Sequence, residues 1–340
     1  MKVISTVSVE RSGENGYEFY RIPGICVTDR GTVLVSYEAR HGSDWSVIDL
    51  YVKRSLDGGK TWEDRIPVFS GEGKNTTNNP VLIADGALVH LLCLKNYKML
   101  YHLTSADEGR TWSEPENITE ALESGRPVWD WTCAAVGPGH GVRLNGGRLL
   151  ASVWLARDRS NITRHWPSKV STLYSDDHGK TWALGEIFEP EGSVNPNESC
   201  LAELSDHRVL MNIRSMKPAG ADRSTPHYRY MAVSDTGCGP WRCYRETQLP
   251  DPVCAGGMCR YPGGLLFTNC ADYADRIRHT LSLSRDDGKT WQNGITYNLP
   301  AGYSDCACHP ASGRILTFYE YDRESELRVS IIAPDESESD

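Results

Sequence analysis

The sequence lacks long apolar runs. None of its hydrophobic stretches approaches the roughly 20 residues that a helix needs to cross a membrane. Its first ten residues, MKVISTVSVE, contain neither a long apolar stretch nor a small-residue cleavage site, so they do not read as a secretory signal peptide. These absences slightly favour a cytoplasmic protein over a secreted one whose signal has been removed.

Basic residues are fewer than acidic ones. The chain has 36 Lys and Arg against 45 Asp and Glu, which gives a net charge of −9. Nucleic acids and anionic membranes repel such a protein, so neither is an expected partner. Part of the negative charge lies in residues 334–340, where four of seven residues are acidic, and we expect this tail to be disordered. An acidic protein can still bind an acidic ligand where its arginines converge.

Paired cysteine motifs are absent. The eleven cysteines include no CxxC pair, and their spacings lack the histidine partners of a zinc site. We therefore expect no metal and no cofactor, and we interpret the cysteines as reduced, buried small hydrophobic residues. Reduced thiols are typical of a reducing compartment.

Helical patterns and linkers are almost missing as well. Only residues 118–124, ITEALES, look helical, and no linker divides the chain. The 340 residues nevertheless exceed the usual size of one compact core. Residues 1–333 are therefore expected to form a single domain with a large repeated architecture.

A repeat is present. The stretch SLDGGKTW at 55–62 recurs at 105–112, 175–182 and 284–291, with a decayed copy at 234–241. The copies lie 50 to 70 residues apart, which is the scale of a four-stranded propeller blade. Each follows a short alternating apolar run, and its Asp and Gly supply the hydrogen bonds and the positive φ of a tight turn. The repeat predicts an all-β propeller whose turns are structural.

The pattern S-x-D-x-G-x-T-W resembles the Asp-box, or BNR repeat, of sialidases (neuraminidases) and related propellers. That resemblance implies a six-bladed β-propeller of four-stranded antiparallel blades. Non-enzymatic propellers carry the same box, so the repeat by itself does not indicate a function.

The resemblance extends to the first blade. Tyr20-Arg21-Ile22-Pro23 is similar to the sialidase motif whose Arg is the first of three that hold the substrate carboxylate. Residues 37–62 resemble the segment that carries the general acid/base, and this places the acid/base at Asp44 and a sugar-binding Arg at Arg40. Asp49 is the rival of Asp44, but it lies inside an alternating strand.

The remaining motifs follow in the order typical of the family. Glu198 and Arg214 match the Glu and second Arg, with Glu203 as a competitor at the wrong interval. Arg276 matches the third Arg, with Arg278, one pleat along on the same face, as the alternative. Tyr303 matches the nucleophile.

Glu320 matches the Glu that orients the first Arg. The seven matches between residues 20 and 320 imply a bacterial-type exo-α-sialidase that retains configuration. Its partner would be a sialylated glycan or a free sialoside.

The chemistry explains these residue types. Three guanidinium groups can bind the carboxylate on the anomeric carbon of sialic acid through charge-assisted hydrogen bonds. A neutral Tyr nucleophile avoids bringing a second carboxylate against the first, but its pKa near 10 demands a base such as Glu198. Asp44 would protonate the leaving oxygen, and for this its pKa must be raised, by desolvation under the bound sugar.

The sugar's other groups are less well specified. Asn79 stands where the family often has an Asp near O4, and Trp129, Asp130 and Trp131 are candidates for an acyl pocket, although a W-x-W strand is equally consistent with packing. His140 is expected near the rim of the site. Three alternatives remain: a glycosidase for another 2-keto-3-deoxy sugar acid, a non-catalytic sugar-binding propeller, and a trans-sialidase.

Overall fold

The computed structural model describes residues 1–161 and 163–334. The expected disordered tail at 334–340 lies outside the described residues except for Pro334. The described chain is all-β apart from α1 (Glu120–Glu123), which falls inside the stretch predicted as helical. Every paired strand is antiparallel to its neighbour in its sheet.

Four sheets are built from consecutive strands: three have four strands each, and the third has five. The first consists of β2 (Phe19–Val27), β3 (Val33–Arg40), β4 (Ile48–Ser55) and β5 (Ile66–Ser70). The second consists of β6 (Thr77–Asp85), β7 (Leu88–Lys95), β8 (Met99–Ser105) and β9 (Glu116–Asn117). The third consists of β10 (Cys133–Val136), β12 (Leu149–Ala156), β13 (Ser168–Ser175) and β14 (Ala183–Leu184), with β11 (Val142–Arg143) paired to β12. The fourth consists of β15 (Ser199–Glu203), β16 (Val209–Ile213), β17 (Tyr228–Ser234) and β18 (Arg242–Pro250).

A fifth sheet has seven strands. Its order is β1 (Lys2–Arg11), β24 (Glu326–Ala333), β23 (Ile315–Tyr321), β22 (Gln292–Cys308), β21 (Ile277–Ser284), β20 (Gly264–Cys270) and β19 (Gly257–Tyr261). The strand β22 is long enough to pair with β21 up to Pro300 and with β23 from Ala301 onward. No turn interrupts the chain at that point, so two sets of strands that we expected as separate four-stranded sheets are joined.

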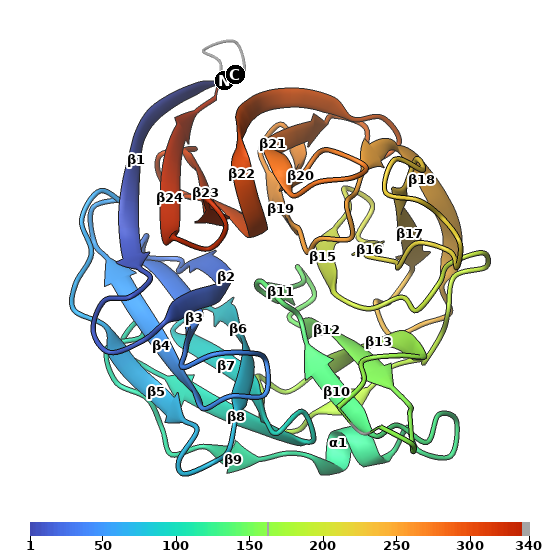
Figure 1. Ribbon diagram of the computed structural model, residues 1–340. Coiled ribbons are helices and arrows are strands. Elements are labelled where there is room, and N and C mark those ends of the chain that lie inside the picture. The colour runs from blue at the N-terminus through green and yellow to red at the C-terminus, as the bar shows by residue number, and fades with distance from the viewer. Residues whose placement is uncertain (162, 335–340) are drawn as a thin grey trace.

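The sheets stand side by side in a ring around a central space (Figure 1). The N-terminal strand β1 pairs with the C-terminal strand β24, which brings the two chain ends together and closes the ring. The apolar core fills the spaces between adjacent sheets: Val33 and Val35 of β3, for example, belong to the same buried cluster as Leu316 and Phe318 of β23. The inner strands are therefore buried on both faces, as in β3.

The four intact repeats form identical turns. In the first, Asp57 accepts hydrogen bonds from the hydroxyl of Ser55 (2.8 Å) and from the amide and hydroxyl of Thr61 (2.9 and 2.7 Å). The same contacts recur in the copies at 105–111, 175–181 and 284–290. The structural interpretation of the repeat is confirmed.

Strand register places these turns away from Arg21. Val27 lies opposite Val33, and Val33 lies opposite Ser55, so the first repeat is at one end of its sheet. Arg21 lies opposite Glu38 near the other end. The repeats therefore lie on the face opposite the arginine motif, as expected.

This separation gives a stability prediction. Burial raises the pKa of Asp107, but the hydrogen bonds from Thr111 and Ser105 together outweigh burial and lower this pKa to about 2. Asp107→Ala should therefore lower the melting temperature by roughly 2–4 °C at neutral pH, and leave the turnover of folded enzyme unchanged. Calorimetry and kinetics would check this, with the exposed Asp64→Ala as control. A large loss of kcat without a loss of stability would contradict the structural role.

Candidate active site

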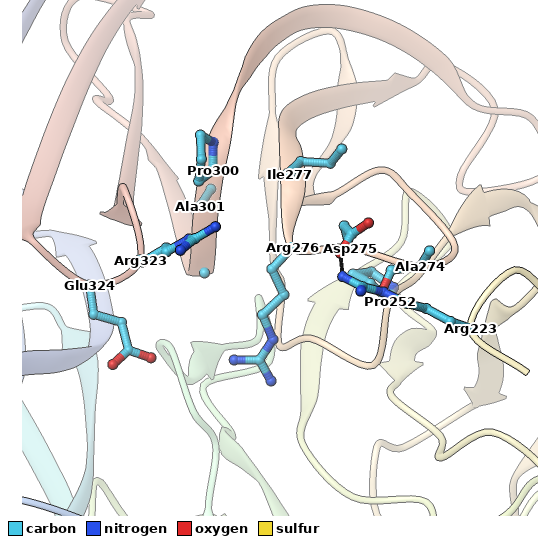
Figure 2. A pocket seen from close by; sticks show the side chains of 11 residues that line it. Arg223, Pro252, Ala274, Asp275, Arg276, Ile277, Pro300, Ala301, Arg323 and Glu324 are labelled. Carbon is cyan, nitrogen blue, oxygen red and sulfur yellow. Dashed lines mark hydrogen bonds and ion pairs between the residues drawn. The ribbon is translucent and has the colours of Figure 1, made fainter.

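A cavity of about 230 Å³ opens at the end of the ring opposite the repeats. Eight of the residues predicted from the sequence line it: Arg21, Arg40, Asp44, Asn79, Glu198, Arg214, Arg276 and Tyr303. They come from the first, second and fifth sheets and from loops, with Glu198 and Arg214 directly next to strands of the fourth sheet. A larger cavity of about 630 Å³ adjoins it at Arg276 (Figure 2).

Bulges in the inner strands orient several of these side chains. The register of β2 shifts between Arg21 and Gly24, that of β6 between Asn78 and Val81, and that of β22 between Ala301 and Ser304. A bulge turns a strand locally and redirects its side chains. Ile22 and Asn79 have positive φ values of 60° and 52°, an uncommon backbone conformation that for a β-branched residue such as Ile22 is strained.

Tyr303 lies at the centre of the constellation. Its phenol oxygen donates a hydrogen bond to Glu198 Oε1 (2.7 Å) and accepts one from Arg214 Nη1 (2.9 Å). Arg214 also forms an ion pair with Glu198. The side chain of Tyr303 is otherwise buried against Ile22, Cys254 and their neighbours, so only its polar end reaches the cavity.

Three arginines surround the Tyr303 ring. The guanidinium carbons of Arg21, Arg214 and Arg276 lie 5.2, 5.9 and 5.3 Å from the ring centroid. The alternative Arg278 is exposed and has a φ of 57°, because the register of β21 shifts between Ile277 and His279. The bulge therefore breaks the pleat that would have placed both arginines on one face.

Glu320 lies beneath the first arginine and is fully buried. Its two oxygens accept hydrogen bonds from Arg21 (3.1 and 3.3 Å) and from the backbone amides of Ile22 (3.1 Å) and Tyr303 (2.9 Å). A second carboxylate that the sequence did not reveal, Glu324, lies 3.0 Å from Arg21 Nε. Burial opposes the charge on Arg21, but the two carboxylates outweigh burial and raise its pKa.

Asp44 lies at the mouth of the cavity. Its side chain is 47% exposed and accepts a hydrogen bond from Arg40 Nη1 (2.5 Å), which in turn contacts the buried Glu38. Burial raises the pKa of Asp44, but Arg40 and Arg21 outweigh burial and hold it below its ordinary value. The raised pKa that an acid role demands is therefore not found at Asp44 in this structure. The rival Asp49 instead accepts hydrogen bonds from Tyr17 (2.7 Å) and Ser70 (2.6 Å), outside the cavity.

One wall of the cavity was not predicted. Tyr97, Trp154 and His165 line it, with ring centroids 5.0 Å apart for both the Tyr97–His165 and the Trp154–His165 pair. Trp166 lies at the mouth and is 45% exposed. Trp154 belongs to β12, whereas Tyr97 and His165 lie in loops of the second and third sheets, and no local motif marked these three residues.

The predicted acyl-pocket residues are elsewhere. Trp131 is buried in the core near α1, where its indole lies against Arg126 at 4.0 Å. Trp129 donates to the Leu155 carbonyl (3.0 Å), and Asp130 forms ion pairs with arginines. None of the three lines the cavity, because this W-x-W segment serves the packing of the third sheet. Glu203 also lies outside the cavity, beside His207.

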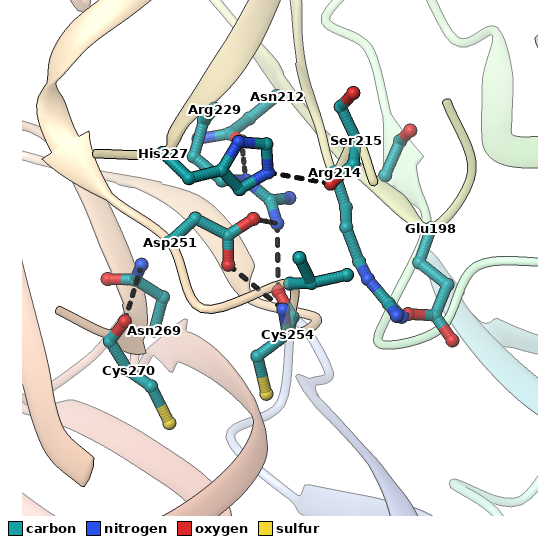
Figure 3. Close-up of polar contacts among 12 residues, drawn as sticks. Glu198, Asn212, Arg214, Ser215, His227, Arg229, Asp251, Cys254, Asn269 and Cys270 are labelled. Atoms are coloured by element: carbon teal, nitrogen blue, oxygen red, sulfur yellow. Dashed lines mark hydrogen bonds and ion pairs between the residues drawn. The ribbon is translucent and has the colours of Figure 1, made fainter. Parts of the chain in front are cut away.

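A buried polar network lies near Arg214 (Figure 3). Arg229, which is fully buried, contacts Asp251 (3.4 Å) and donates to the Cys254 carbonyl (2.9 Å), while Asp251 accepts from the Cys254 amide (2.9 Å). The segment held in this way presents the Val253 carbonyl to Arg276 (3.2 Å). The network fixes the backbone on which Arg276 rests.

His140 is not at the rim of the cavity. It contacts both carboxylate oxygens of the buried Asp305 at 2.9 Å and lines a different cavity with Val27 and Cys308. Burial lowers the pKa of His140, but Asp305 outweighs burial and raises it to about 8.

This pair gives a pH prediction. A raised folded-state pKa stabilises the fold fully below the unfolded pKa near 6.5, and that contribution disappears as the pH rises through about 8. The melting temperature should therefore fall between pH 6.5 and 8.5, and His140→Gln should remove this part of the fall. His207→Gln, at an exposed histidine, is the matched control. If the melting temperature of wild type and of His140→Gln varied with pH in the same way, the role of the His140–Asp305 pair would be contradicted.

The described residues contain no group of three or more His, Cys, Asp or Glu side chains placed to hold a metal ion. No helix within the described ranges is both long and apolar enough to cross a membrane.

Comparison with known proteins identifies the class. The family described as BNR repeat-like domain matches residues 31–306, so the chain belongs to this family. A sialidase of Micromonospora viridifaciens is 31% identical over 320 residues, which cover 82% of this chain and 46% of that protein. Human sialidase-4 is 42% identical over 275 residues, which cover 72% of this chain and 54% of that protein. With these relatives, membership of the sialidase family, predicted from the motifs, is confirmed.

Solved structures agree on the fold. The Hadza microbial sialidase Hz136 superposes with a TM-score of 0.82 at 22% identity, covering 96% of this chain and 68% of that one. The intramolecular trans-sialidase from Ruminococcus gnavus superposes with a TM-score of 0.77 at 17% identity. The match covers 100% of this chain and 99% of that one. The chain spans about half the length of the sialidases from Bacteroides fragilis (56%) and M. viridifaciens (46%) that it resembles in sequence.

Proposed function

We propose that this protein is a retaining exo-α-sialidase, which hydrolyses terminal sialic acid from glycoconjugates through a covalent tyrosyl intermediate. The observation that carries the proposal is the 2.7 Å contact between the Tyr303 phenol and Glu198, inside three arginines. Sialidases are known as glycosidases with a Tyr nucleophile. The sialidase names of the relatives support the same activity.

In this mechanism the guanidinium groups of Arg21, Arg214 and Arg276 bind the sugar carboxylate. Glu320 fixes Arg21 and offsets part of the repulsion among the three cations. The sugar's anomeric carbon is thereby held above the Tyr303 oxygen. A sialylated glycan or a free sialoside is the substrate.

Glu198 takes the phenolic proton as Tyr303 attacks, and Arg214, 2.9 Å from the same oxygen, stabilises the developing phenolate. Asp44 protonates the leaving oxygen and then activates the water that hydrolyses the intermediate. A bound sugar would displace water from Asp44 and raise its pKa from the low value of the free site. Arg40 orients Asp44 and lies where it can hold a sugar hydroxyl.

The fold belongs to the same proposal. Dividing the seven-stranded sheet within β22, where its partner changes from β21 to β23, yields two four-stranded units. With the other four sheets this gives a six-bladed propeller over residues 1–333 as one domain.

A second candidate is a glycosidase for another 2-keto-3-deoxy sugar acid. Asn79 lines the cavity in place of the acid common in the family, so recognition near O4 and C5 differs from the usual pattern. A Trypanosoma rangeli sialidase of similar fold (TM-score 0.73) has been solved in complex with 2-keto-3-deoxy-D-glycero-D-galacto-2,3-difluoro-nononic acid. A panel of aryl glycosides that differ at C5 would separate the two candidates.

The decisive experiment is proton NMR of the first sugar released from an aryl α-sialoside, read before mutarotation. An α-configured first product and labelling of the Tyr303 peptide by a fluorinated sialosyl fluoride are expected. A β-configured first product would mean direct attack by water. A lack of any release, with binding retained, would favour a non-catalytic sugar-binding propeller.

A further inference from the structure

A second cavity beside the sugar site has a positively charged wall that the proposed mechanism does not use. Its volume is about 630 Å³, compared with about 230 Å³ for the sugar cavity, and the two share Arg276. Arg323 and Glu324 lie on one side of Arg276, and Asp275 and Arg223 lie on the other (Figure 2). The space is large enough for a further sugar residue.

The charges of this cavity are unbalanced. Its two acidic residues are each paired, Asp275 with Arg223 and Glu324 with Arg21. Arg323 is exposed and forms no ion pair with any residue in the described part of the chain. Arg323 therefore presents an uncompensated guanidinium group, and Arg276 adds a second positive group at the shared edge.

The route of the leaving group leads toward this wall. Tyr303 attacks from the floor of the sugar cavity, so the bond that breaks points to the mouth, where Asp44 lies. A smaller cavity of about 290 Å³ begins at Asp44 and extends to Glu324, and the large cavity begins at that same residue. A glycan that leaves past Asp44 can thus reach Arg323.

We propose that the large cavity binds the leaving part of a substrate that carries its own carboxylate, namely a glycan in which the terminal sialic acid is linked to a second one. This inference rests on the proposed function. Arg323 contacts the second carboxylate, and the shared edge at Arg276 joins its site to the sugar cavity. The cavity makes Arg323 a specificity-determining residue, with no part in the chemical step.

The test is the ratio of kcat/KM for a disialyl lactose to kcat/KM for an aryl sialoside, which has no second sugar. Arg323→Gln should lower this ratio about fivefold, the effect of one partly exposed ion pair, and Arg323→Glu should lower it further. Arg110→Ala, which removes an exposed arginine from a repeat turn on the opposite face, should leave the ratio unchanged. Using the ratio cancels any general loss of active enzyme.

The outcomes are separable. If wild-type enzyme does not hydrolyse the aryl sialoside, the proposed function fails. If it does, but the ratio is the same in wild type and Arg323→Glu, only the second-carboxylate site is overturned. A sulfated monosialyl lactose is the comparison substrate: if its rate depends on Arg323 and that of disialyl lactose does not, the assignment to a sugar carboxylate is wrong.

Discussion

Tyr303→Phe should lower kcat on natural sialosides by at least about a thousandfold, because the substitution removes only the oxygen that acts as nucleophile in the proposed mechanism. The Tyr303 ring is buried and packs against apolar neighbours, and a Phe ring keeps those contacts. The three arginines keep their positions around the ring, so binding of a sialic acid analogue should survive. Steady-state kinetics together with calorimetric titration of the analogue would measure both.

Two companion variants sharpen this result. Glu198→Gln should lower kcat by about 10²–10⁴-fold. In the proposed mechanism Glu198, 2.7 Å from the Tyr303 oxygen, is the base that accepts the phenolic proton. Tyr297→Phe is the matched control, since Tyr297 lies in the same strand but stacks on His279 outside the cavity. Equal losses in Tyr303→Phe and Tyr297→Phe would refute the assignment of the nucleophile.

Asp44→Asn should separate substrates by their leaving groups. A natural glycosidic oxygen needs a proton as it departs, so kcat/KM should fall by about 10²–10⁴-fold. An aryl sialoside with a good leaving group scarcely needs that proton, and its first step should be much less affected. Burst-phase kinetics with the two kinds of substrate would measure the difference.

The pH dependence of kcat/KM for the wild-type enzyme should also indicate that Asp44 acts as an acid. Burial raises the pKa of Asp44, but Arg40 and Arg21 outweigh it and hold this pKa below its ordinary value, so the protonated fraction of Asp44 grows as the pH falls. The value of kcat/KM for natural linkages should therefore increase toward acid pH. Asp49→Asn is the control. If the loss of activity depended on the leaving group in Asp49→Asn and not in Asp44→Asn, Asp49 rather than Asp44 would be the general acid.

The sequence by itself determined the features that depend on near neighbours in the chain. Each repeat turn closes within seven residues, as Asp57 shows by binding Ser55 and Thr61, so composition and order suffice to define it. The arginines, Glu198 and Tyr303 could also be found, because each stands in a short motif that the family uses for one role.

Only the tertiary structure decided what depends on distant segments. Glu198 and Tyr303 are 105 positions apart and Arg21 and Glu320 are 299 apart, yet each pair is in contact because the sheets close into a ring. A bulge in β21, which the strand pattern does not reveal, selected Arg276 over Arg278.

Dependence on distant segments also explains why the acyl pocket predicted at residues 129–131 was wrong. Trp129 and Trp131 have the pattern of either a ligand wall or a packed strand, and nothing local distinguishes the two. Trp154 and His165 form the actual wall because the second and third sheets meet the cavity there. The packing of one sheet against another determines which side chains face a shared cavity. That packing depends on residues far apart in the chain, so no short stretch of sequence reveals it.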